Sequence, residues 1–254
     1  MQTHIIQSGY LRVRAEEMIK PLPEKHISAI YRIDTEGYMK TAMNALLIIA
    51  EEQVVLMDPG CADFLPSRLI QEYGLEIPVP LEEKIGHLGY SAESITDVIF
   101  THLHFDHGSG AFRRVPGKIV KRFPNARYHV LKAHYEYAKH PNPKESNSFF
   151  TSFLRYLDTI HWLEEWDREF IDFRIFNGHT RGMVVPVIKT PEVDTYYVTD
   201  LIPLELFLKS GVHSGYDLNP ELAMREKQEF LKELDKSSRL IFFHDPLKES
   251  VFYP

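Results

Sequence analysis

The segment over residues 101–110 reads THLHFDHGSG and places four possible metal ligands close together: His102, His104, Asp106 and His107. Side chains alternate between the two faces of an extended chain, so the first two histidines point to the same side. A turn after them can carry the other two ligands round to a shared point. The glycines at positions 108 and 110 permit the close backbone approach or positive φ that such a turn demands. Imidazole and carboxylate donors together suit zinc, iron or manganese.

Strand-like runs lead into this segment and follow it. Residues 97–100 form a short strand that runs directly into the histidines, and residues 45–49 and 54–57 indicate a hairpin. The second arm of the hairpin ends in the turn chemistry of Asp58-Pro59-Gly60. Later strands are expected over residues 128–131, 173–176, 183–188, 195–199 and 240–243.

The strongest helix signal begins at Asn219, a good N-cap, and Pro220, which suits the first helical position. Apolar residues recur along one face of this helix at Ala223, Phe230, Leu231 and Leu234. A weaker, helix-like pattern covers residues 63–73 and ends at Gly74. Strands and helices alternate without a break in composition, so we expect one α/β domain over residues 1–254.

An aromatic-rich stretch over residues 142–166 follows a proline-containing linker. One interpretation is a helix whose aromatic side chains belong to the core. The other is a helical lid or wall over a pocket, because aromatic side chains can line an apolar ligand site. In the second case Phe149 is a candidate substrate contact.

Composition narrows the classes of protein. The chain has 254 residues and a net charge of −7, and its hydrophobic share of 44% excludes a disordered chain. The acidic balance argues against nucleic-acid binding. The single cysteine, Cys61, excludes an intrachain disulfide or a cysteine-rich zinc site, and a buried apolar role is expected for it. Apolar runs are too short for a signal peptide or a membrane helix, so a cytoplasmic protein with no membrane partner is expected.

The histidine segment resembles the defining His-x-His-x-Asp-His motif of the metallo-β-lactamase superfamily. Other elements of that family follow in order. Residues 55–60 look like its early strand ending in Asp-x-Gly, and Gly178-His179-Thr180 looks like its second metal-binding loop. Asp200 and His244 each end a predicted strand, as the family's bridging aspartate and last histidine ligand do.

The resemblance implies a four-layer αβ/βα sandwich with two divalent metal ions. Zinc is the expected metal, with manganese and iron as alternatives. One ion would take His102, His104 and His179, the second would take Asp106, His107 and His244, and Asp200 would bridge both. Two such ions can hold a hydroxide between them and polarise a substrate oxygen, which gives hydrolysis. The resemblance also suggests that Asp106 steers the nucleophile or protonates the leaving group.

Within the superfamily, residues 200–202 and 216–222 look most like the branch of acyl homoserine lactonases and organophosphate hydrolases. A lactone or ester is therefore the expected substrate, with Tyr38 and Tyr216 bordering its pocket, and a homodimer is the expected assembly. Two positions depart from that branch. Pro203 stands where quorum-signal lactonases commonly carry a tyrosine, which Tyr38 or Tyr216 would have to replace, and Arg181 replaces a proline of the second metal-binding loop.

Three alternatives stay open. Within the same chemistry they are a thioesterase of the glyoxalase type and an organophosphate triesterase, and outside it a metal-stabilised binding module without activity. An RNA nuclease is disfavoured by the charge of −7. Surface or structural roles are expected for the histidines outside the motifs, which are His4, His26, His87, His129, His134, His140, His161 and His213.

Overall fold

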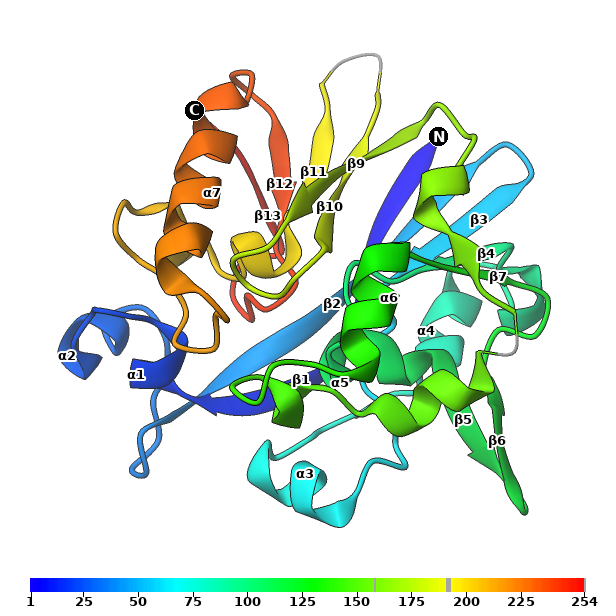
Figure 1. Ribbon diagram of the computed structural model, residues 1–254, viewed down its shortest axis with the longest axis horizontal. Helices are drawn as coiled ribbons and strands as arrows, with labels where there is room; N and C mark the ends of the chain where they lie inside the picture. The colour runs from blue at the N-terminus through cyan, green and yellow to red at the C-terminus, as the bar shows by residue number, and fades with distance from the viewer. Residues whose placement is uncertain (158, 191–192, 254) are drawn as a thin grey trace. The chain divides into compact units, whose positions relative to one another are not determined.

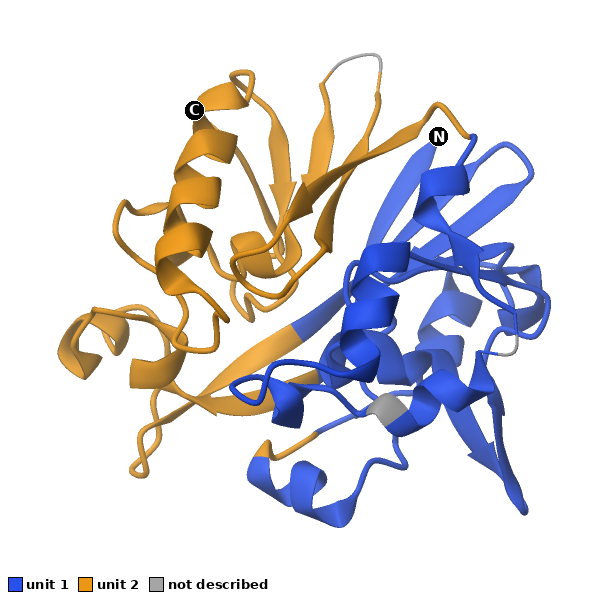
Figure 2. Cartoon of the chain, viewed as in Figure 1, with its two compact units in different colours: residues 1–9, 43–72, 76–167 blue, residues 10–42, 73–75, 168–254 orange. Residues whose placement is uncertain are grey.

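The computed structural model describes residues 1–157, 159–190 and 193–253 (Figure 1). These residues form two compact units (Figure 2). Unit 1 holds residues 1–9, 43–72 and 76–167, and unit 2 holds residues 10–42, 73–75 and 168–254. The organisation as one domain over residues 1–254 stays a prediction.

A six-stranded sheet has the order β1-β2-β3-β4-β7-β8. Its strands are β1 (Gln2–Arg14), β2 (Tyr38–Ala50), β3 (Gln53–Met57), β4 (Asp97–Ile99), β7 (Arg127–Val130) and β8 (His161–Trp162). The predicted hairpin is confirmed, because β2 and β3 pair antiparallel with Leu46 opposite Met57. From β3 to β8 neighbouring strands run parallel, so their carboxyl ends meet at one edge. The histidine segment follows β4 at that edge.

The other elements of unit 1 are short. Its helices are α3 (Ser67–Glu72), α4 (Leu81–His87), α5 (Phe105–Gly108) and α6 (Lys132–Lys139), with 3-10 helices η1 (Ala92–Ser94) and η2 (Ser109–Ala111). A separate hairpin pairs β5 (Phe112–Val115) with β6 (Lys118–Lys121). The helix expected over residues 63–73 begins only at Ser67. Leu65 precedes Pro66, and a residue before proline is held away from the helical region.

The aromatic-rich stretch contains short 3-10 helices where the sequence suggested a longer helix. These are η3 (Ser146–Ser148), η4 (Thr151–Tyr156) and η5 (Leu163–Glu165), and residue 158 lies outside the described residues. The run of Ser, Asn and Thr here competes with helical hydrogen bonding. Phe153 is fully buried, and its ring packs 5.4 Å from that of Phe112, so this part of the stretch contributes to the core of unit 1.

Unit 2 is built on a five-stranded sheet of order β13-β12-β11-β10-β9. The strands are β9 (Ile171–Phe176), β10 (Met183–Ile188), β11 (Thr195–Tyr197), β12 (Arg239–Ile241) and β13 (Ser250–Phe252). The helices are α1 (Ala15–Met18), α2 (Glu24–Ile27) and α7 (Pro220–Glu233), with 3-10 helices η6 (Thr199–Leu201) and η7 (Glu205–Leu208). The pairing of β11 with β12 is parallel, whereas the other pairs are antiparallel.

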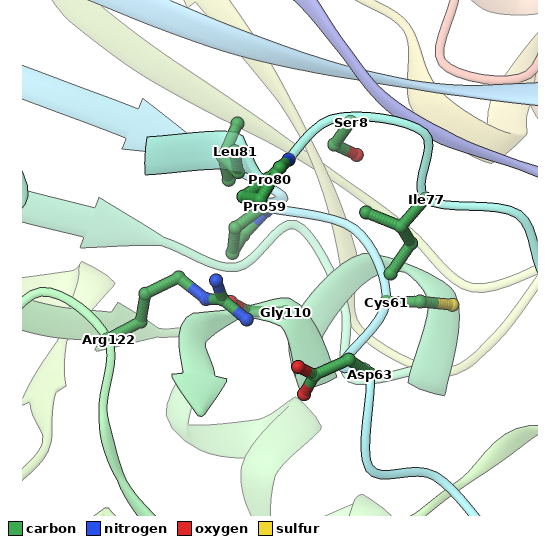
Figure 3. Close-up of a pocket in the computed structure, with 9 residues that line it drawn as sticks. All are labelled: Ser8, Pro59, Cys61, Asp63, Ile77, Pro80, Leu81, Gly110 and Arg122. Atoms are coloured by element: carbon green, nitrogen blue, oxygen red, sulfur yellow. The ribbon is translucent and has the colours of Figure 1, made fainter. Parts of the chain in front are cut away.

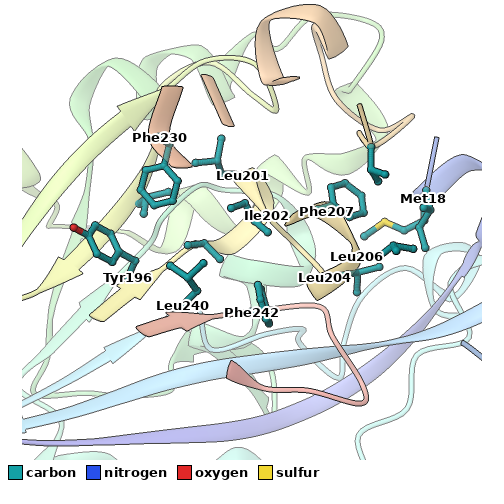
Figure 4. Close-up of a cluster of buried hydrophobic side chains, with 14 of the residues drawn as sticks. Met18, Tyr196, Leu201, Ile202, Leu204, Leu206, Phe207, Phe230, Leu240 and Phe242 are labelled. Carbon is teal, nitrogen blue, oxygen red and sulfur yellow. The ribbon is translucent and has the colours of Figure 1, made fainter. Parts of the chain in front are cut away.

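Helix α7 covers this sheet with its apolar face (Figure 4). The predicted cap is confirmed, because the Asn219 side chain accepts a hydrogen bond from the Leu222 amide at 3.1 Å. Phe230 packs edge-on against Phe176 and Tyr196, with ring centroids 5.9 and 5.4 Å away. Among the residues that the structure describes, no helix combines the length and apolar character needed to cross a membrane.

The packing of Phe230 yields a stability prediction. Phe230→Ala should lower the free energy of unfolding by about 3–5 kcal/mol, since it removes a 2% exposed ring and leaves a cavity between α7 and the sheet. Phe252→Ala, at a 67% exposed ring, is the matched control and should change it by less than about 0.5 kcal/mol. Urea denaturation measures both, and equal effects would contradict the packing of Phe230 between α7 and the sheet.

Candidate metal centre

The histidine segment follows β4 through a bend at Thr101, and His104 has extended φ and ψ of −60° and 149°. The side chains of His102 and His104 lie side by side, as predicted. Their rings lie edge-on, and Nε2 of His102 is 3.1 Å from Nδ1 of His104. With 0% and 5% of their surfaces exposed, both imidazoles present a nitrogen to the same buried point.

Helix α5 is the turn that brings in the other two candidate ligands, Asp106 and His107. The amides of His107 and Gly108 donate to the His104 carbonyl at 3.1 and 3.0 Å, which closes the turn directly after the second histidine. The ring of His107 then lies 4.0 Å from that of His102, and its Nε2 is 4.0 Å from Oδ2 of Asp106. All four residues of the motif thus converge within unit 1.

Asp58 is buried beneath this turn and holds it in place. One carboxylate oxygen accepts from the Thr101 amide at 2.9 Å, and the other accepts from the Thr101 hydroxyl at 2.5 Å and from Nδ1 of His107 at 2.9 Å. Asp58, His102 and His107 could themselves form a ligand cluster. Because these hydrogen bonds occupy both oxygens of Asp58, we assign it the role of orienting His107, whose Nε2 then faces the ligand side.

The loop after Asp58 approaches the turn closely. The Gly60 amide donates to the His107 carbonyl at 3.2 Å, and the Gly110 amide donates to the Gly60 carbonyl at 2.7 Å. A Cβ at Gly110 would lie 2.6 Å from the Pro59 carbonyl oxygen, so only glycine fits there. Gly108 has a φ of −101° and does not use the left-handed region that the sequence allowed for it.

A cavity of about 170 Å³ adjoins this loop (Figure 3). Arg122 forms part of its wall, donating to the Gly110 carbonyl at 2.7 Å and to the Glu82 carboxylate at 2.6 Å. Cys61 also lines it and is 5% exposed, and burial raises the pKa of its thiol. A protonated, buried thiol agrees with the apolar role predicted for Cys61.

Glu145 lies beside His104, and no sequence motif indicates this contact. Its Oε2 lies 3.4 Å from Nε2 of His104, and its Oε1 accepts a hydrogen bond from the Tyr137 hydroxyl. Phe149, the predicted substrate contact, is 8% exposed and packs its ring edge-on at 4.7 Å against His104. His134 accepts a hydrogen bond from the Leu103 amide at 2.8 Å, which gives it the structural role expected.

Unit 2 carries the three later candidate ligands. His179 lies in the turn between β9 and β10, whereas Asp200 and His244 follow the parallel neighbours β11 and β12. Asp200 Oδ2 is 3.1 Å from Nε2 of His179, and Oδ1 is 3.5 Å from Nε2 of His244. One carboxylate oxygen thus faces each imidazole, so Asp200 could share a metal with either histidine.

The Nδ1 atoms of His179 and His244 also have oxygen partners. Nδ1 of His179 is 3.0 Å from Oδ1 of Asp217, and Nδ1 of His244 is 2.9 Å from the Ala42 carbonyl. The His244 amide donates at 3.1 Å to the carbonyl of Pro203, the residue predicted to stand in place of the lactonase tyrosine. Asp217 is thus a second outer partner that no sequence motif indicates.

Electrostatics in unit 2 favour a cation at His179. Burial by itself lowers the pKa of this imidazole, but the carboxylates of Asp200 and Asp217 outweigh burial and raise it to about 10. This pKa favours a protonated His179 at neutral pH in the absence of metal. A divalent ion bound at Nε2 would take the place of that proton.

The five candidate histidine ligands share one arrangement. One ring nitrogen lies within hydrogen-bonding distance of an oxygen atom, and the other is the candidate metal-binding atom. The oxygen partners are the Thr101 hydroxyl, the Glu145, Asp58 and Asp217 carboxylates and the Ala42 carbonyl. Outer partners of this kind fix the ring orientation and tautomer of metal-binding histidines. The donor sets of both units therefore fit a divalent metal.

The two tyrosines predicted to border the pocket lie near each other in unit 2. Tyr38 is flanked by the guanidinium groups of Arg12 and Arg14, each 4.7 Å from its ring centroid. Partial burial, with smaller effects of Glu17 and Tyr38, raises the pKa of Tyr216 to about 12, so its hydroxyl stays protonated. Contact of Tyr38, Tyr216 or Phe149 with a substrate stays a prediction.

Comparison with known proteins identifies the family. The family model of the metallo-beta-lactamase superfamily matches residues 41–243. The chain therefore belongs to this superfamily, as its motif predicted. This membership makes the protein a metal-dependent hydrolase and confirms the expected αβ/βα sandwich fold class. None of the curated proteins matches the chain.

Several solved structures share the fold. A probable metal-dependent hydrolase from Staphylococcus aureus has a TM-score of 0.87 at 18% identity, covering 99% of this chain and 92% of that one. AidC, a dizinc quorum-quenching lactonase in complex with a homoserine product, has a TM-score of 0.78 at 23% identity, covering 98% and 89%. The hydrolase AbOPH has a TM-score of 0.76 at 20% identity, covering 100% and 90%. The neighbours include the predicted lactonase branch.

The role of Asp58 can be tested through stability and metal binding. Asp58→Ala should lower the free energy of unfolding by about 3–5 kcal/mol, because it leaves the Thr101 amide and the His107 imidazole buried without their acceptor. It should also weaken zinc binding about 10–100-fold. Chemical denaturation and chelator competition measure the two effects. Asp63→Ala, at an exposed neighbouring aspartate, should change neither.

Proposed function

We propose that the protein opens a lactone or a related ester by hydrolysis at a centre of two divalent ions, zinc first. In this proposal one ion is held by His102, His104 and His179, the second by Asp106, His107 and His244, and Asp200 binds both. The observation that carries the proposal is the carboxylate of Asp200, which turns one oxygen to His179 and the other to His244. Membership of the superfamily supports the combination of the two ligand sets.

Bound divalent ions supply a Lewis acid for the substrate carbonyl and lower the pKa of a water molecule towards neutrality. The residues of the chain orient these ions. Asp58, Glu145 and Asp217 hold three of the imidazoles with carboxylates, so each ring keeps its ligand nitrogen aimed at the ion without rearrangement. Such preorganisation removes the reorganisation cost at the moment of reaction.

Asp106 is proposed as the proton-transfer residue. Its side chain is 15% exposed, more than those of the neighbouring histidines, and the Asp58 contacts fix the helix turn that carries it. A carboxylate at this point can accept a proton from the attacking water and then pass that proton to the leaving alkoxide. Opening a lactone ring requires both steps.

The proposed substrate is a lactone because solved structures of the same fold include quorum-quenching lactonases bound to homoserine products. Pro203 offers no hydroxyl at the position of the lactonase tyrosine. The protonated hydroxyl of Tyr216 is proposed to donate to the substrate in its place, with Tyr38 beside it. Phe149, packed on His104, is proposed to contact the acyl part.

A substrate panel with metal analysis tests this function. The zinc-loaded protein should contain about two ions per chain and hydrolyse acyl homoserine lactones or simple lactones faster than thioesters, aryl phosphotriesters or a β-lactam. Fewer than about one ion per chain after zinc loading would refute the two-ion centre. Faster hydrolysis of thioesters or phosphotriesters would contradict the proposed lactone substrate and identify that class as the substrate.

Asp200→Ala provides the matched test of the bridge. Loss of a shared ligand should reduce kcat/KM by more than the roughly 10–100-fold that loss of an outer partner costs, and should lower the bound metal below two ions. Asp235→Ala changes an exposed aspartate of the same unit and should leave kcat/KM within about twofold. Full turnover by the Asp200 variant would place the chemistry elsewhere.

A further inference from the structure

We propose that Glu145 is a positioning residue that makes Nδ1 the ligand atom of His104 and couples the segment of residues 142–149 to metal occupancy. This inference rests on the proposed metal centre. It adds a residue from outside every family motif, 41 positions along the chain from the histidine that it contacts.

The first step is the choice of ring nitrogen. Oε2 of Glu145 lies 3.4 Å from Nε2 of His104, and the side chains of both are buried, at 2% and 6% exposure. A carboxylate accepts and cannot donate, so this nitrogen must carry the proton. The lone pair of the neutral ring is then on Nδ1, which lies 3.1 Å from Nε2 of His102. Glu145 thereby selects the tautomer in which His104 can share an ion with His102.

The second step is the support of Glu145 itself. Its other oxygen accepts from the Tyr137 hydroxyl, and that hydroxyl accepts in turn from the Asn142 amide at 3.0 Å. Tyr137 lies on α6, so the carboxylate is fixed from a regular helix as well as from its own loop. A buried carboxylate requires compensation. A divalent ion on the opposite nitrogen of His104 supplies positive charge through the same ring.

The third step is the segment that carries Glu145. The Glu145 amide donates to the Asn142 carbonyl at 3.1 Å, and the Ser148 amide donates to the Glu145 carbonyl at 2.9 Å, so the chain turns tightly on both sides. Phe149 follows and packs edge-on against His104 at 4.7 Å. His104 is therefore held by a polar and an apolar contact from one short segment. An ion that fixes His104 should therefore reduce local unfolding of residues 142–149.

Glu145 lies behind its imidazole, on the nitrogen opposite the ligand atom. It acts through His104, so its signature is the affinity and geometry of the metal centre. Cobalt substitution reports that geometry directly, because the visible absorption of Co²⁺ follows its coordination. Hydrogen exchange of residues 140–150 reports the coupling to the segment.

The experiment compares four full-length proteins: wild type, Glu145→Gln, Tyr137→Phe and Glu136→Gln. Glu145→Gln removes the charge with little change of shape, and Tyr137→Phe removes only the hydroxyl that supports Glu145. Glu136 is the control because it is an exposed carboxylate on α6, paired with Lys139 at 2.8 Å. Zinc affinity is measured by competition with a chromophoric chelator, followed by the Co²⁺ spectrum and by hydrogen exchange with and without zinc.

We expect Glu145→Gln to bind zinc about 10–100-fold more weakly, to shift the Co²⁺ absorption and to lose the protection that zinc gives residues 140–150. Tyr137→Phe should weaken binding in the same direction by a smaller factor, and Glu136→Gln should match wild type. If wild type binds no ion, the proposed function fails and this inference with it. If wild type binds zinc and Glu145→Gln binds it equally well with an unchanged Co²⁺ spectrum, this inference alone is overturned. Should Glu145→Gln not fold, wild-type affinity in Tyr137→Phe overturns it.

Discussion

The rest of the site depends on one constraint: each candidate histidine ligand has one ring nitrogen hydrogen-bonded to a fixed oxygen atom. An imidazole can bind a metal through either nitrogen, and it can rotate about two bonds. Asp58, beneath His107, removes that freedom in unit 1, and Asp217, beside His179, removes it in unit 2. The sheets, turns and glycine contacts of each unit hold these oxygens within hydrogen-bonding distance of the imidazole rings.

The local sequence pattern was enough to predict the candidate ligands of unit 1. His102, His104, Asp106 and His107 are close in sequence, and a strand followed by one helical turn is the simplest path that gathers them. Hydrophobic runs likewise predicted β3, β10 and the capped start of α7 to within a few residues. β1 was missed because its apolar residues are interspersed with polar ones and buried only in part.

The outer partners could not be predicted, because no local rule links them to their histidines. Glu145 is 41 positions from His104, and Asp217 is 38 positions from His179. Each lies in an irregular stretch, and only the folded backbone brings its carboxylate to the ring. The single helix suggested over residues 142–166 is wrong for a different reason: Ser, Asn and Thr side chains compete with helical hydrogen bonding there, and the stretch forms the short 3-10 helices η3, η4 and η5.

The parallel pairing of β11 with β12 has a consequence for the chain between these strands. Asp200 and His244 leave neighbouring strands at the same end, with Tyr197 in register with Ile241, so their separation is set by the sheet. The intervening chain of η7, the Tyr216 loop and α7 contributes little to that separation. Insertions in that chain would therefore leave the spacing of Asp200 and His244 unchanged.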